Sequence, residues 1–251
     1  MKVFCLSNHK GGTGKSTATA NIGAALALEA RRTLLIDLDA QSNLSMSFGV
    51  KSPDKHVYGA LMGKYPLSDA LVKISESLSV IPSTLDLSAA EIELSAESGR
   101  ELILKELLEP LGSSFDYCLI DCAPHLGLLI LNAFAAAQKV LIPIQLEYFA
   151  AQGLSTLEGL IAKIQKRLNP ALEIGGVFVS RHSGKKILSR DVLASVQEKF
   201  SGKVFGTKIR ECVSLAEAPV KGQDIFRYSP KSAGAEDYKQ LTREILQRFE
   251  L

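Results

Sequence analysis

His9-Lys10-Gly11-Gly12-Thr13-Gly14-Lys15-Ser16-Thr17 is the stretch of this 251-residue sequence that decides the fold. It stands between a short apolar run, residues 2–7, and an Ala-rich segment of helical character that begins at residue 15. Its three glycines allow consecutive backbone N–H groups to face a phosphate without Cβ clashes, and a following helix adds the positive end of its dipole. The sequence therefore predicts a phosphate-binding loop between a strand and a helix.

The loop departs from the ordinary pattern G-x-x-x-x-G-K-[ST], because His9 stands where the first glycine belongs. It has gained a second lysine, Lys10, five residues before Lys15. We expect Lys15 to hold the β- and γ-phosphates of ATP and the hydroxyl of Ser16 to bind Mg²⁺, which prefers oxygen ligands. Lys10 lies outside the cradle, so we expect it to act on a nucleotide across a dimer interface, as an arginine finger does. The expected nucleotide-binding residues are Lys10, Gly11, Gly12, Thr13, Gly14, Lys15, Ser16 and Thr17.

Two acidic segments end apolar runs, where a doubly wound sheet places its ligand chemistry. Asp37 and Asp39 close the first run, and Asp121 closes the second in the manner of a Walker-B carboxylate. Either segment alone is equally consistent with an acidic residue that caps the next helix. Together with the loop they predict a catalytic site, in which Asp39 is the carboxylate best placed to orient the attacking water.

Short apolar runs of strand character alternate with helical patterns along the chain, which is typical of βαβ units around a mainly parallel sheet. Strands are expected at residues 2–7, 33–37, 78–81, 117–121, 139–144 and 174–180. Helices are expected at 15–30, 87–98, 101–111, 127–137, 153–168, 189–200 and 235–249, and residues 49–71 are the most loop-like. The sequence predicts an α/β fold in a single domain, residues 1–251, with a twisted sheet covered by helices on both faces.

Composition excludes several classes of protein. The charge of +2, from 29 basic and 27 acidic residues, rules out a histone-like or strongly acidic protein. No stretch of about 20 apolar residues occurs, so we exclude integral membrane association, and the N-terminal apolar run is too short for a signal peptide. The four cysteines form no CxxC pair and are expected to be reduced core thiols. We expect a cytoplasmic protein.

Several motifs resemble the ParA/Soj partition ATPases, P-loop NTPases with a deviant Walker A motif that also include MinD. Besides K-G-G-T-G-K-S, the matching segments are L-I-D-L-D-A-Q-S-N at 35–43, L-S-A-A-E-I-E-L at 87–94, D-C-A-P-H-L-G-L-L-I-L-N at 121–132, I-P-I-Q-L-E-Y-F-A-A-Q-G-L at 142–154, L-A-E-A-P at 215–219 and S-A-G-A-E-D-Y at 232–238. They follow the family's order and cover nearly the whole chain.

This resemblance implies a slow Mg²⁺-dependent ATPase whose ATP-bound form is a sandwich homodimer. Lys10 would reach the partner's nucleotide, Asp39 would activate water, and Asp37 and Asp121 would support Mg²⁺ together with Ser16. The dimer would bind nucleoid DNA without sequence preference, and a centromere-binding protein of the ParB/Spo0J type would accelerate hydrolysis. The expected role is chromosome or plasmid partition.

The segment that binds DNA in relatives departs from their pattern I-P-R-N-V-R-L-S-E-A-P, because this chain reads I-R-E-C-V-S-L-A-E-A-P at 209–219. Residues 181–210 nevertheless hold eight basic and two acidic residues, a net charge of +6. Such a patch is typical of phosphate contacts, although a solvated basic surface would look the same. The expected DNA-binding residues are Lys185, Lys186, Arg190 and Arg210. The loop at 209–212 is also a candidate for contacts with adenine.

Two other functions remain open from the residues. One is a MinD-like or cargo-positioning ATPase on a membrane or protein scaffold, because Tyr238, Leu241, Ile245, Leu246 and Phe249 form an apolar stripe that could face lipid. We expect this stripe to pack on the sheet instead. The other is a regulatory adaptor that hardly hydrolyses ATP, because Ala40, Ser42, Ala123 and His125 replace the residues usual in relatives.

Overall fold

The computed structural model describes residues 1–147, 150–183 and 188–249. Within these ranges, eight strands form one sheet in the order β3-β4-β2-β5-β1-β6-β7-β8. They are β1 (Lys2–Leu6), β2 (Thr33–Leu38), β3 (Val72–Lys73), β4 (Leu78–Ile81), β5 (Tyr117–Cys122), β6 (Lys139–Ile144), β7 (Glu173–His182) and β8 (Val204–Arg210). Neighbouring strands are parallel except β3 and β4. The predicted α/β class and mainly parallel sheet are confirmed.

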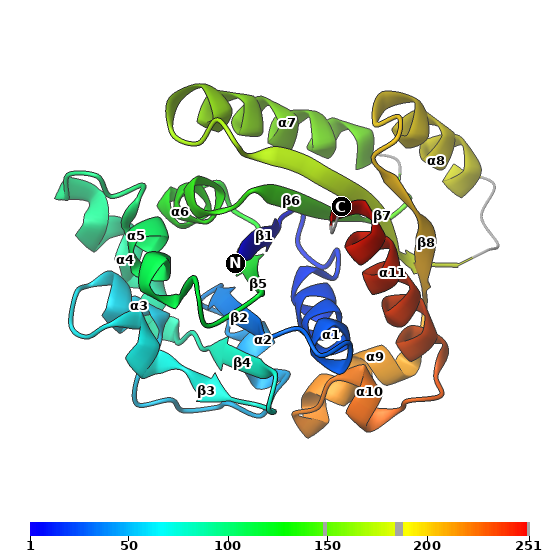
Figure 1. Ribbon diagram of the computed structural model, residues 1–251. Coiled ribbons are helices and arrows are strands. Elements are labelled where there is room, and N and C mark those ends of the chain that lie inside the picture. The colour runs from blue at the N-terminus through cyan, green and yellow to red at the C-terminus, as the bar shows by residue number, and fades with distance from the viewer. Residues whose placement is uncertain (148–149, 184–187, 250–251) are drawn as a thin grey trace.

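Helices cover both faces of this sheet, as Figure 1 shows. The α-helices are α1 (Lys15–Leu28), α2 (Asn43–Met46), α3 (Val57–Leu61), α4 (Ala90–Glu93), α5 (Ile103–Leu108), α6 (Leu128–Ala136), α7 (Ala150–Arg167), α8 (Leu188–Lys199), α9 (Val213–Glu217), α10 (Ile225–Tyr228) and α11 (Ala233–Phe249). Short 3₁₀ turns are η1 (Leu67–Ala70), η2 (Leu85–Ala89), η3 (Leu94–Ala96), η4 (Glu109–Leu111) and η5 (Ala218–Lys221). None of the described helices is long and apolar enough to cross a bilayer.

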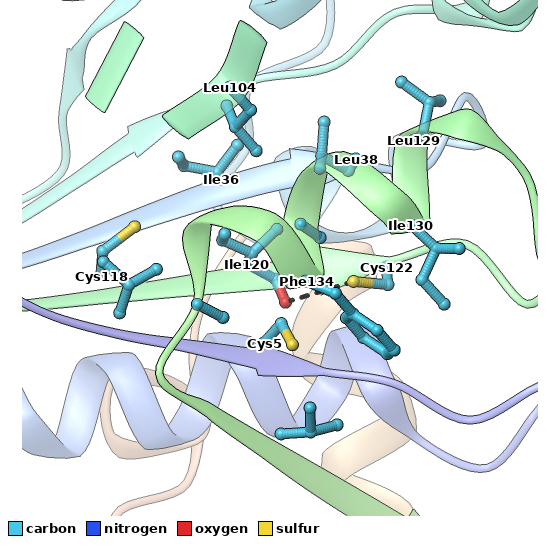
Figure 2. Close-up of a cluster of buried hydrophobic side chains, with 14 of the residues drawn as sticks. Cys5, Ile36, Leu38, Leu104, Cys118, Ile120, Cys122, Leu129, Ile130 and Phe134 are labelled. Carbon is cyan, nitrogen blue, oxygen red and sulfur yellow. Dashed lines mark hydrogen bonds between the residues drawn. The ribbon is translucent and has the colours of Figure 1, made fainter. Parts of the chain in front are cut away.

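Two hydrophobic cores lie on opposite faces of the sheet, because successive side chains of a strand point to opposite sides. Val3 and Cys5 of β1 belong to the first core, whereas Phe4 and Leu6 belong to the second. Helices α3, α5, α6, α7 and α8 contribute to the first core, and α1, α2 and α11 contribute to the second. Figure 2 shows part of the first core, where Phe134 of α6 lies among side chains of the central strands.

Three of the four cysteines are buried, as expected of core thiols, and all four are free. Burial raises the pKa of Cys5 and of Cys118, so these thiols stay neutral. Cys212 is only half-buried and lines a cavity, so the expectation of a core position is wrong for this residue.

The sequence-based elements differ from the structure in several places, and the short helices α2, α9 and α10 are among those that were not expected. β3 and β8 were not expected, and the loop-like segment 49–71 contains α3 and η1, whose side chains Val57 and Leu67 are buried. The helix expected at 87–98 is broken into η2, α4 and η3. The hydroxyls of Ser88 and Ser95 donate to the carbonyls of Leu85 (2.8 Å) and Ile92 (2.6 Å), and such local bonds compete with a continuous helix.

Helix α11 covers the outer edge of β8. Glu244 of α11 accepts hydrogen bonds from the backbone N–H groups of Gly206 (2.8 Å) and Thr207 (2.9 Å), and Asp237 accepts from that of Arg210 (2.8 Å). The predicted packing of this helix on the sheet is confirmed, because Tyr238, Leu241 and Ile245 are buried in the second core.

The strand order places the loops after β1 and β5 next to each other. Strands β2 to β5 lie on one side of β1 in the sheet, and β6 to β8 lie on its other side, so the direction in which the chain adds strands reverses at β1. Open α/β sheets bind their ligands at the carboxyl ends of strands around such a reversal.

Candidate functional site

The glycine-rich loop connects β1 to α1, as predicted. Gly12 (φ 74°) and Gly14 (φ 86°) adopt left-handed backbone conformations that disfavour any residue with a Cβ. A Cβ added to Gly11 or Gly12 would meet no atom within 4 Å, so the loop borders open space. Helix α1 begins at Lys15, directly after Gly14, and its first N–H groups therefore face the same space.

Polar side chains of β7 and of the residue that follows β6 fix this loop to the sheet. The Ser180 hydroxyl donates to the carbonyl of Thr13 (2.7 Å), and the Gln145 amide donates to the carbonyl of Gly12 (2.8 Å). These anchors come from residues more than 130 positions away along the chain, and no sequence pattern pointed to them. These two bonds turn the carbonyls of Gly12 and Thr13 away from the open space that the loop borders.

Lys15 is almost fully buried, and its Nζ donates to the carbonyl of Lys10 (3.3 Å). Burial lowers its pKa, while the charges of Asp121 and Asp39 act in the opposite direction. Lys10 is half-exposed and forms an ion pair with Glu147 at the surface. The two lysines of the motif are therefore in different environments: one points into the protein and the other toward solvent.

The two carboxylates that end β2 and β5 lie side by side. Asp37 and Asp121 are partners in the register of these strands, and both are fully buried. Burial raises the pKa of Asp37 to about 6, and burial together with the charge of Asp37 raises that of Asp121 well above its usual value. Two buried carboxyl groups this close favour the binding of a positive charge.

Asp37 is tightly held, whereas Asp121 keeps one oxygen available. The backbone N–H and hydroxyl of Ser45 donate to Oδ2 of Asp37 (2.8 and 2.7 Å), and the N–H of Asp39 donates to its Oδ1 (3.1 Å). Oδ2 of Asp121 is buried without a hydrogen-bond partner. Such an orphaned oxygen, together with the Ser16 hydroxyl, which lowers the pKa of Asp121, fits a hard cation.

Among the described residues, no group of three or more His, Cys, Asp or Glu side chains could hold a metal ion by itself. A magnesium ion here would therefore depend on phosphate and water oxygens for most of its ligands, as is usual for this cation.

A cavity of about 1160 Å³ is lined by part of the glycine-rich loop and by Asp39, whereas the buried Asp37 and Asp121 are not among its lining residues. Its floor is the loop with Lys15 and Ser16, and its walls come from residues 38–47, 123–129 and 209–220. Asp39 lines it, and one oxygen of its carboxylate accepts from the N–H of Gln41 (3.0 Å). This volume is ample for a nucleotide.

The wall formed by residues 209–220 was not predicted as an element. Glu211, Cys212 and Val213 follow β8 and line the cavity, and Val213 and Val220 are highly exposed although they are apolar.

The thiol of Cys212 in this wall has a lowered pKa. Burial alone would raise the pKa, but hydrogen bonds from the backbone of Gly234, Ser214 and Leu215 outweigh this effect.

Of the four expected DNA-binding residues, only Arg210 has a side chain that the structure describes. Lys185 and Lys186 lie outside the described residues, and Arg190 lies in α8, with a side chain that is also outside them. Arg210 ends β8 and lines the cavity, where its guanidinium is paired with Asp237 and Glu236. The Arg210 side chain is 48% exposed, so part of its surface remains open to solvent beside the two carboxylates.

Comparisons with known proteins agree with this geometry. A family model described as an AAA domain (AAA_31) matches residues 1–174. The chain is 42% identical over 248 residues to the chromosome-partitioning ATPase Soj of Treponema pallidum, covering 98% of each chain. It is 40% identical over 250 residues to the chromosome partitioning protein ParA of Myxococcus xanthus, covering 98% of this chain and 88% of that one.

Solved structures with the same fold include one described as cobyrinic acid a,c-diamide synthase from Mycobacterium smegmatis with bound ADP and magnesium. It superposes with a TM-score of 0.87 at 34% identity and covers 100% of this chain and 96% of that one.

Proposed function

This chain belongs to the Soj/ParA family of chromosome-partitioning ATPases, and we propose that it hydrolyses ATP with Mg²⁺, dimerises when ATP is bound, and partitions DNA by binding it without sequence preference. The observation that carries this proposal is the cavity that the glycine-rich loop, Lys15 and Asp39 line together. An ADP- and magnesium-bound structure of the same fold supports the choice of cofactors.

We assign the phosphates of ATP to the loop from Lys10 to Thr17 and the base to the wall at 209–220. The N–H groups of the loop and the buried ammonium of Lys15 would neutralise the charge of the phosphates. The apolar side chains Val213 and Val220 are then covered by the flat base instead of remaining exposed.

Ser16, Asp37 and Asp121 are the residues that would hold Mg²⁺. The bound ion would add positive charge beside the β- and γ-phosphates. Ser45 orients Asp37 through two hydrogen bonds, so the carboxylate is preorganised. Asp39 lines the cavity, and we assign to it the role of orienting the attacking water or accepting its proton.

Lys10 is the residue assigned to the nucleotide of a second copy. Its ammonium is half-exposed and paired with Glu147, which is also half-exposed. Solvent-exposed ion pairs contribute about 0–1 kcal/mol, so Lys10 can exchange this carboxylate for a phosphate at little cost. The exchange would connect ATP binding to dimer formation, and hydrolysis would release the dimer.

DNA binding is assigned to Lys185 and Lys186, which precede α8 in the sequence, and to Arg190 within α8. A ParB/Spo0J-type protein is the proposed activator of hydrolysis. Arg210 is left out of this set because its charge is already paired. A nucleoid-associated location follows from the proposal.

Light scattering with ADP and with ATP tests the dimer. We expect a monomer with ADP and a dimer with ATP, a stable ATP dimer for Asp39→Ala, and no dimer for Lys10→Ala. Lys64→Ala is a matched control, because Lys64 is an exposed lysine that does not line the cavity and lies over the Tyr58 ring, so this variant should dimerise as wild type does. A monomer under every condition would refute the assignment of Lys10.

Retention on nonspecific DNA tests the second half of the proposal. We expect ATP-dependent binding that falls steeply with salt and is lost when Lys185, Lys186 and Arg190 are all changed to Ala. Each removed phosphate contact should reduce the magnitude of the negative slope of log affinity against log salt by about 0.9. Binding that is equal with ATP and ADP at low salt would contradict the DNA-partition role. Phosphate release with DNA and partner that does not exceed that of Asp39→Ala would contradict the ATPase role.

A further inference from the structure

Arg210 and Asp237 form a dense set of hydrogen bonds between the end of β8 and the start of α11. The backbone N–H of Arg210 donates to Oδ2 of Asp237 (2.8 Å), its Nε lies 3.0 Å from both carboxylate oxygens, and its Nη2 donates to Oδ1 (2.6 Å). Nη2 also donates to the carboxylate of Glu236 (2.6 Å). One carboxylate thus holds both the backbone and the side chain of one residue.

The environment of this pair makes it stronger than an ordinary surface ion pair. The Asp237 side chain is only 7% exposed, whereas that of Arg210 is 48% exposed. The bonds to Asp237, followed by those to Glu236, raise the pKa of Arg210. Charge-assisted hydrogen bonds to a buried carboxylate are about twice as strong as neutral ones, and removal of one partner leaves the other uncompensated.

Both partners adjoin residues that line the nucleotide cavity. Glu211 and Cys212 follow Arg210 directly in the wall, and Tyr238 follows Asp237 and lines the same cavity. The wall is fixed to α11 at a second point, since a Cβ on Gly234 would come within 2.7 Å of the Leu215 side chain. The pair therefore sets the distance between the two elements that border the cavity opposite the glycine-rich loop.

We propose that Asp237 and Arg210 form a clamp that positions the base-binding wall, so that Asp237 is a positioning residue for nucleoside recognition and leaves the phosphate loop unaffected. This inference rests on the proposed ATP-binding function. It replaces the expected contact of Arg210 with DNA by a contact inside the protein, and it assigns affinity for the base to two residues that never touch the phosphates.

Calorimetric titration with ATP and, separately, with inorganic tripolyphosphate tests the clamp, because tripolyphosphate occupies the loop but has no base. In Asp237→Asn and in Arg210→Lys, we expect the Kd for ATP to rise about tenfold, which is the loss expected for a strong charge-assisted bond. The Kd for tripolyphosphate should stay within about twofold of wild type, because the loop anchors Ser180 and Gln145 are unchanged.

Asp116→Asn is the matched control. Asp116 also pairs with an arginine, Arg32, but the pair lies at the amino ends of β2 and β5, opposite the cavity. This variant should bind both ligands as wild type does. Thermal unfolding of each variant shows whether the fold is retained.

Three results would overturn the clamp: an unchanged ATP affinity, an equal loss of ATP and tripolyphosphate affinity, or a loss of DNA retention in Arg210→Lys with ATP affinity intact. The second would show general loosening, and the third would return Arg210 to DNA binding. Failure of wild type to bind ATP would instead refute the proposed function itself.

Discussion

The buried pair Asp37 and Asp121 makes the stability of the ligand-free protein depend on pH. Asp37 has a pKa of about 6 in the fold against an ordinary value of 3.8, because it is buried. A carboxyl group whose pKa is raised by folding binds its proton more tightly in the native state. Its contribution to stability is therefore complete below pH 3.8 and is lost as the pH rises through 6.

The magnitude follows from the shift. At about 1.36 kcal/mol per pKa unit, a rise from 3.8 to about 6 corresponds to about 3 kcal/mol in total. At pH 5 about half of this stabilisation is already lost, and the remainder of about 1.4 kcal/mol is lost between pH 5 and pH 8. Asp121, whose pKa is also raised, adds to the loss in the same direction.

Urea unfolding without nucleotide at pH 5 and pH 8 measures this effect. Wild type should lose at least about 1.4 kcal/mol of unfolding free energy between the two, and Asp37→Asn should lose clearly less, because the pair then holds one titratable group. Asp116→Asn is the control, since Arg32 lowers the pKa of Asp116 and its contribution is lost toward acid. Equal stability of wild type at both pH values, or an unchanged loss in Asp37→Asn, would refute this account of the site.

Three further predictions concern packing and anchoring. Asn132→Ala should lower the free energy of unfolding by about 2–4 kcal/mol in urea titration, because the buried amide of Asn132 bonds three backbone groups; no loss would show that those groups find other partners. Ser180→Ala should weaken ATP and tripolyphosphate binding alike by about tenfold in calorimetry, because the carbonyl of Thr13 loses its donor, and a loss for ATP alone would contradict this. Gly23→Ala should destabilise by about 1–3 kcal/mol in thermal unfolding, because its Cβ would lie 2.4 Å from Leu35, and an unchanged Tm would mean that the side chain moves freely.

The sequence predicted the central part of the fold because its signals are local. Apolar runs such as 117–121 are buried on both faces and need no knowledge of their neighbours to be recognised. The signal of the loop from Lys10 to Thr17 is equally local, because its glycines are needed for the conformation of the loop's own backbone. Strand β8 was missed because burial alternates along its length and it contains Gly206 and Lys208, which obscure a strand pattern.

The contacts that hold the cavity wall could not be predicted because they join distant residues, although the loop at 209–212 was a candidate for contacts with adenine. Arg210 and Asp237 are 27 residues apart, and counting charges along residues 181–210 assigned Arg210 to a solvated patch. Ser45, which holds Asp37 from eight residues away, also followed no spacing rule. Both contacts become visible only when the strands and helices are packed.

The covered edge of β8 has a consequence for self-association. An open edge strand is a template on which another chain can add a strand, and this leads to uncontrolled assembly. Here the side chains of Glu244 and Asp237 occupy N–H groups at one edge of the described sheet, and the opposite edge, β3, is only two residues long. Strand addition is therefore disfavoured at both ends. The ATP-dependent association proposed above would therefore use the loops around the cavity and not the edges of the sheet.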